Sequence, residues 1–92
     1  MTSVPSILYH RHPDALHTDL ITEAVLIHGS TGRSFRLNGS ARLLWAALPT
    51  SPEDLAALLA RTYGLDPLQA HTDVQALLEQ LQRLDLVQAR TV

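Results

Sequence analysis

Histidine and aspartate are the residues of this sequence whose types suit acid–base or metal chemistry, and they gather near its start. His10, His12 and His17 lie close together, with Asp14 and Asp19 interleaved. In an extended segment, His10 and His12 place two imidazoles on one side. A metal site needs a third or fourth ligand, and no recognised spacing links these residues. We therefore expect solvent-facing polar residues of an edge strand and a loop, with a metal-binding enzyme as the alternative.

The remaining histidines add no recognisable catalytic arrangement. His28 ends an expected strand, and His71 lies early in the last expected helix. Neither falls in a Ser/His/Asp pattern, and no glycine-rich phosphate loop is present. The absence of cysteine excludes disulfides and thiolate chemistry, and it fits a reducing compartment. We expect no enzyme activity, no catalytic residue, no cofactor and no metal.

Composition limits the classes of partner. The 92 residues are 46% hydrophobic and 17% charged, as expected for one globular domain over residues 1–92. The net charge of −2 gives no general attraction for nucleic acid. No apolar run is long enough to cross a bilayer, and no signal-peptide pattern opens the sequence. We expect a cytoplasmic protein with neither a nucleic-acid nor a membrane partner.

The first third of the chain predicts strands at 6–10, 22–28 and 33–37, with a loop around Pro13-Asp14 between the first two. The two glycines of segment 29–32 suit a turn because they accept positive φ. These segments predict a three-stranded antiparallel meander, in which the strand at 33–37 comes last.

This last strand has two different faces and a free edge. Phe35 and Leu37 point one way, while Ser34 and Arg36 point the other. The last strand of a meander leaves N–H and C=O groups unpaired on its outer side. An extended peptide can pair with such an edge by β-augmentation. The alternative is an edge blunted by the charges of Arg33 and Arg36.

Three helices are predicted in the remaining two thirds. Asn38 suits the N-cap of the first, while Ser51-Pro52 and Asp66-Pro67 are cap-then-proline starts of the second and third. Gly64 suits the end of the second helix. A short terminal extension is expected at 86–88. Apolar residues repeat at helical spacing along the third helix, namely Ala70, Val74, Leu77, Leu78, Leu81 and Leu84.

The predicted order gives an α+β fold, a three-stranded antiparallel sheet followed by three helices, similar in order to a winged helix-turn-helix. A small DNA-binding regulator is therefore an alternative. Such a protein carries basic residues on its recognition helix. Here the longest helix has Arg83 at its far end against Asp66, Asp73, Glu79 and Asp85 around it, a charge pattern unsuited to phosphates.

The ordered set of segments resembles the PqqD-like family of small peptide chaperones, also called RiPP recognition elements. The resemblance rests on VLIH, FRLNGSARLLWAAL, SPEDL, LLARTYGLDP and DVQALLEQLQRLDLV, and it spans roughly 7–87. It implies a non-catalytic domain that binds the leader of a ribosomally made precursor peptide and presents it to separate enzymes.

The resemblance also implies where the leader lies. It adds as a strand to the third strand, and its apolar side chains enter a cleft bounded by the third helix. Carried onto this sequence, the edge is Arg33, Ser34, Phe35, Arg36 and Leu37, and the cleft wall is Ala70, Asp73, Val74, Leu77 and Leu81. Core packing is the alternative role for Val74 and Leu77.

Within the family, the chain resembles the stand-alone recognition proteins of lasso-peptide biosynthesis, which work with a separate transglutaminase-like leader peptidase and a cyclase. The lysine-free, RTYGLDP-containing pattern favours this type. The alternative is the chaperone of pyrroloquinoline quinone synthesis, which works with a radical S-adenosylmethionine enzyme.

Overall fold

The computed structural model describes residues 7–21 and 23–91. Its strands are β1 (Ile7–Arg11), β2 (Ala15–Asp19), β3 (Ala24–His28), β4 (Ser34–Leu37) and β5 (Val87–Thr91), and its helices are α1 (Gly39–Ala46), α2 (Pro52–Tyr63) and α3 (Pro67–Arg83). Strands precede three consecutive helices, and the α+β class predicted from the sequence is confirmed.

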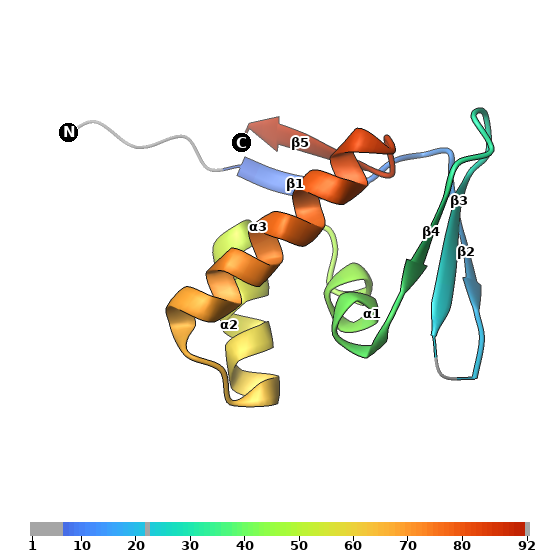
Figure 1. Cartoon of the computed structure of the whole chain (residues 1–92). Helices are drawn as coiled ribbons and strands as arrows, with labels where there is room; N and C mark the ends of the chain where they lie inside the picture. The colour runs from blue at the N-terminus through green and yellow to red at the C-terminus, as the bar shows by residue number, and fades with distance from the viewer. Residues whose placement is uncertain (1–6, 22, 92) are drawn as a thin grey trace.

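A three-stranded antiparallel sheet has the order β2-β3-β4, so β4 lies at an edge. The inner residues of β3, Ala24, Leu26 and His28, are buried, while Ile27 between them is exposed. This alternation is expected of a strand with one face on a core. In Figure 1 α1 lies between this sheet and the pair α2 and α3.

β1 belongs to a second sheet, and this corrects the predicted meander. β1 pairs antiparallel with β5, so Ile7 lies opposite Thr91, near the two ends of the described chain. The third member of the meander is instead β2, a segment after the loop for which the sequence predicts no strand. The expected terminal extension at 86–88 is the start of β5. Ser6 and Thr22, the first residues of two predicted strands, lie outside the described residues.

The helix boundaries follow the predicted capping residues. The Asn38 side chain accepts a hydrogen bond from the Ala41 N–H, and the Ser51 hydroxyl accepts one from the Asp54 N–H. The Asp66 carboxylate caps α3, and Gly64 ends α2 in the left-handed region at φ 66°. Each cap satisfies main-chain groups that the helix itself leaves unpaired.

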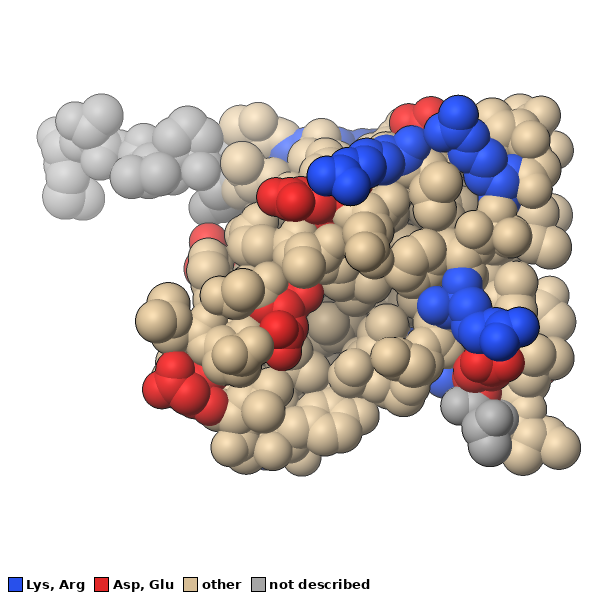
Figure 2. Space-filling view, viewed as in Figure 1, with Lys and Arg blue, Asp and Glu red and all other residues tan. Residues whose placement is uncertain are grey.

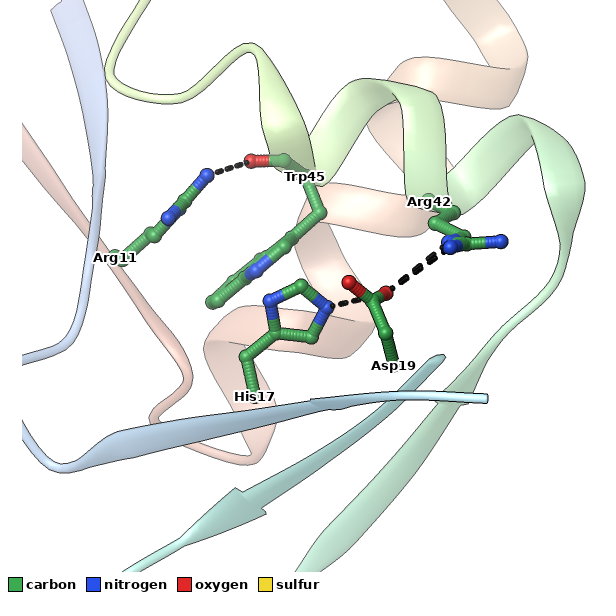
Figure 3. Close-up of polar contacts among 5 residues, drawn as sticks. All are labelled: Arg11, His17, Asp19, Arg42 and Trp45. Carbon is green, nitrogen blue, oxygen red and sulfur yellow. Dashed lines mark hydrogen bonds and ion pairs between the residues drawn. The ribbon is translucent and has the colours of Figure 1, made fainter. Parts of the chain in front are cut away.

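Trp45 of α1 contacts residues of both sheets. Its side chain is 1% exposed, and the Arg11 guanidinium of β1 lies 5.1 Å from its ring centroid. Arg11 also donates to the Trp45 carbonyl at 2.9 Å (Figure 3). From β2, His17 meets the indole edge-on, and Asp19 accepts from Arg42 at 3.2 Å. These contacts hold α1 in place, and with it the turn that follows β4.

The core extends along α3, which packs against α2 and β5. None of the helices within residues 7–21 and 23–91 combines the length and the apolar character needed to cross a membrane.

Candidate functional site

The outer edge of β4 presents main-chain groups that β3 does not use. The N–H of His28 donates to the carbonyl of Arg33 at 2.8 Å, which makes this pair a hydrogen-bonded one. Hydrogen-bonded pairs alternate along an antiparallel ladder. The N–H and C=O groups of Phe35 and Leu37 therefore also point toward β3. Those of Ser34 and Arg36 point outward, away from the sheet. β4 is the last strand of the sheet in the described part of the chain.

A groove of about 710 Å³ runs beside this edge, between β4 and α3. Residues of α1 and of the second half of α2 also line it. The lining residues are Phe35, Arg36, Asn38, Gly39, Ser40, Ala41, Leu44, Leu59, Tyr63, Leu65, Asp73, Ala76, Leu77 and Gln80. Figure 2 shows this face hollowed between the two sides, with uncharged atoms across the hollow.

The groove has an apolar interior and a charge on each wall. Phe35 and Leu77 are half-buried at its sides, and Tyr63 is 50% exposed. Arg36, on the β4 wall, pairs with Glu23 at 3.4 Å. Asp73, on the α3 wall, accepts from the Gln69 amide at 2.8 Å. An amphipathic extended peptide fits this combination because alternate side chains point to opposite faces.

Four residues of the predicted site line the groove, namely Phe35, Arg36, Asp73 and Leu77. Four others lie in the core at 0–1% exposure, namely Leu37, Ala70, Val74 and Leu81. The remaining two are exposed and do not line the groove. Ser34 offers its main chain at the edge, and Arg33 donates to the Arg83 carbonyl at 3.2 Å, which links β4 to the end of α3.

Residues absent from the predicted set complete the groove. Asp73, Ala76, Leu77 and Gln80 form one row at spacings of three and four along α3, beside the buried row. The helical spacing of the sequence could therefore have indicated Ala76 and Gln80 as groove residues. Nothing in the sequence indicates Tyr63, because the end of α2 reaches the groove only through tertiary packing.

Two of the histidines lie close together beside the sheet. Ligand atoms of His12, Asp14 and His28 lie within 4.8 Å of one another. However, Nδ1 of His12 accepts from the Asp14 N–H, and Nδ1 of His28 accepts from the Ser30 and Thr31 N–H groups. Nδ1 of each ring therefore already serves as a hydrogen-bond acceptor for main-chain N–H groups. The three residues instead organise the turns beside the sheet.

Fold and groove together define a small α+β domain with an open strand edge beside an apolar cleft. The family model for "Coenzyme PQQ synthesis protein D (PqqD)" matches residues 23–87. The chain therefore belongs to the PqqD family, as its sequence predicts. No match exists among curated proteins.

Two solved structures are similar to this chain. One is described as a lasso peptide synthetase B1 complexed with the leader peptide; it has 26% sequence identity and a TM-score of 0.78, and the match covers 87% of this chain and 96% of that one. The other is TbiB1 in complex with the TbiA(beta) leader peptide; it has 22% identity and a TM-score of 0.80, and the match covers 86% and 94% of the two chains.

Proposed function

We propose that this chain binds the leader of a ribosomally made precursor peptide and delivers it to separate maturation enzymes of lasso-peptide biosynthesis. The observation that carries the proposal is the outward main chain of Ser34 and Arg36 directly beside an apolar groove. Family membership supports it, as do the leader peptides bound to both similar structures.

The leader binds as a fourth strand on β4. Ser34 and Arg36 each offer one N–H donor and one C=O acceptor to its main chain. These bonds fix the register and depend little on the leader sequence. Every second leader side chain then points to the side of Phe35 and enters the groove, where Leu77 and Tyr63 contact it. Selectivity comes from these apolar contacts.

The affinity follows from the size of the site. A short peptide loses conformational freedom on binding, so only part of its contact energy appears as affinity. We expect a Kd between roughly nanomolar and micromolar, or about −8 to −12 kcal/mol. Such a range suits a carrier, because the leader must also be released.

The chain contributes recognition and no chemistry of its own. We place it in the cytoplasm as a single domain over residues 1–92, without cofactor or metal. Its partners are a transglutaminase-like leader peptidase, which removes the leader, and a cyclase, which receives the precursor. Neither nucleic acid nor membrane is a partner in this proposal.

A second candidate within the family is a chaperone of pyrroloquinoline quinone synthesis, which the description of the matching family model favours. The groove suits either precursor. The two candidates differ in the enzyme served, which is a radical S-adenosylmethionine enzyme in the second case. The acidic residues of α3 disfavour the DNA-binding alternative.

The test is direct binding. A fluorescent synthetic leader of a candidate precursor peptide from the same genome is titrated with the purified protein and followed by polarisation. We expect saturable binding in the range above, and none for a scrambled leader of equal composition. Equal binding of the scrambled peptide, or salt-sensitive retention of DNA with no leader binding, contradicts the proposal.

A further inference from the structure

Arg33 directly precedes β4 and forms a hydrogen bond to the end of α3. Its guanidinium donates to the main-chain carbonyl of Arg83, the last residue of α3, at 3.2 Å. Among the hydrogen bonds and ion pairs of residues 7–21 and 23–91, no other joins segment 33–37 to α3. In Figure 1 the start of β4 and the end of α3 both lie toward the top of the molecule.

The carbonyl of Arg83 takes its partner from outside the helix. Beyond α3, the Leu86 N–H donates to the Leu81 carbonyl at 2.9 Å, and the Asp85 N–H donates to the Gln82 carbonyl at 3.0 Å. Asp85 has the left-handed φ, 56°, that this type of helix end requires. The pattern leaves the Arg83 carbonyl free to accept, at the end of the helix where the dipole favours a cation. A guanidinium suits this position because it combines a charge with several N–H donors.

Arg33 is itself held in place by the turn before β4. Its N–H donates to the Thr31 hydroxyl at 3.2 Å, and its carbonyl accepts from the His28 N–H at 2.8 Å. Both of its main-chain groups are therefore bonded within the β3–β4 hairpin. The side chain extends from this fixed point to α3, so its hydrogen bond relates the position of the hairpin to that of the helix.

The Arg33–Arg83 hydrogen bond lies at one end of the groove. Gln80 of α3 lines the groove, and Arg83 follows it by three residues, which is about one turn further on the same side of the helix. Phe35 of β4 lines the groove, and Arg33 lies two residues before it, on the same face by strand alternation. Neither arginine lines the groove itself. The bond thus connects the two walls just beyond the space that leader side chains enter.

We propose that Arg33 is a positioning residue for leader binding, which fixes the separation between β4 and α3 and thereby sets the width of the groove. The inference rests on the leader-binding function proposed above, and it adds a residue that acts without touching the leader. A groove that already has its bound width loses less conformational freedom when the leader binds. A fixed width also separates leader side chains by size, because a larger side chain cannot widen the groove.

Direct contact with the leader is the competing role for Arg33, since this residue is exposed and charged. The two roles depend on different properties of the leader. A direct ion pair acts only on a leader that carries an acidic residue at that place. A fixed groove width acts on every leader, whatever its charge, and it also affects the protein without leader.

The first measurement uses the full chain without leader. The chain has no cysteine, so Ser34→Cys and Gln82→Cys introduce two exposed sites for spin labels, one on β4 and one on α3. Pulsed electron resonance then gives the distribution of distances between the two elements. We expect Arg33→Ala to broaden this distribution, and Arg33→Lys to restore it, because an ammonium group also donates to a carbonyl. An unchanged distribution in Arg33→Ala overturns the inference.

The second measurement is leader binding by polarisation, on chains without the two labels. Fluorescent synthetic leaders of one candidate precursor peptide from the same genome are compared: the native leader, one with its acidic residues changed to amides, and one with an apolar residue enlarged to tryptophan. Arg61→Ala is the matched control, because it removes the same charge from the last turn of α2, outside the groove lining. Circular dichroism checks the fold of each variant.

We expect Arg33→Ala to bind the native leader and the amide leader about fivefold more weakly, and Arg33→Lys and Arg61→Ala to stay within about twofold of the unmodified chain. Arg33→Ala should also discriminate less against the tryptophan leader. A general loss of stability would instead lower the affinity for every leader by the same factor.

Two binding results overturn the inference. One is an effect of Arg33→Ala confined to the native leader, because Arg33 then contacts an acidic leader residue. The other is an equal loss of affinity for all leaders, because Arg33 then serves stability alone. Absence of leader binding by the unmodified chain instead defeats the proposed function, while the distance measurement still decides whether Arg33 fixes the two walls.

Discussion

Two neighbouring rows of α3 have opposite roles, although both carry apolar residues at helical spacing. The first row, Ala70, Val74, Leu78 and Leu81, is 0–2% exposed and packs against the rest of the core. The second row, Asp73, Ala76, Leu77 and Gln80, lines the groove. Substitutions one turn apart on this helix should therefore separate folding from leader binding.

The largest effect is expected at the buried row. Val74→Asp places a carboxylate at a fully buried position, with no partner to compensate its lost hydration. We expect a loss of about 4 kcal/mol or more, which is most of the stability of a small domain. Circular dichroism should show lost helical signal and a lowered Tm. A folded Val74→Asp protein that merely fails to bind leader would assign Val74 to the binding site instead.

The next effect is expected at the edge strand. Arg36→Pro removes an outward N–H and inserts a ring where the leader strand must approach, so leader binding should fall by about 30-fold or more. The helical signal should persist, since that N–H does not bond to β3. Arg36→Ala is the matched control, because it keeps the N–H while it removes the side chain beyond Cβ and its pairing with Glu23. Equal affinities of Arg36→Pro and Arg36→Ala would contradict pairing at β4.

A smaller effect is expected at the groove row. Leu77→Asp lies at a half-buried position beside the groove, so it should weaken leader binding by about tenfold while the Tm changes by a few degrees. Polarisation and thermal melts of the same preparation provide both values. If Leu77→Asp unfolds the domain as Val74→Asp does, the distinction between the two rows fails.

The smallest effect is expected from Asp73, whose charge lies exposed on the groove wall. Asp73→Asn retains an oxygen to accept from Gln69 and removes only the charge. Binding of a leader with a basic residue facing α3 should weaken by about twofold to threefold, and the difference should vanish at high salt. Two synthetic leaders that differ in one charge provide the comparison.

Helices were predictable here because their signals are local. Asn38, Ser51, Asp66 and Gly64 each act on main-chain groups within a few residues, and all four mark helix ends in the structure. The apolar period of α3 likewise predicted a helix over this segment.

Strand pairing was less predictable because it is not local. Ile7–Arg11 carries a strand pattern, but nothing in it specifies β5 at the far end of the chain as its partner. Ala15–Asp19 has few apolar residues, and one of them, Leu16, faces solvent, so its alternation was hidden. The edge position of the strand at 33–37 was nevertheless predicted, since it depends only on the turn before it and the helix after it.

The elements that form the site could be predicted from the sequence more fully than the individual residues that line it. The family resemblance implies a cleft between β4 and α3, but the sequence cannot say which row of α3 faces that cleft, because both rows share one helical period. The outward main chain of Ser34 and Arg36 also depends on the β3 register, which only the structure provides.

The pairing of β1 with β5 brings the two ends of the described chain side by side. Ile7 and Thr91 are opposite each other, and neither strand lines the groove. A polypeptide can therefore enter and leave the domain at one point on its surface. Such a unit can be inserted into a loop of a larger enzyme, or permuted, with its groove and β4 edge unchanged. The same architecture thus suits both a free carrier and a built-in module.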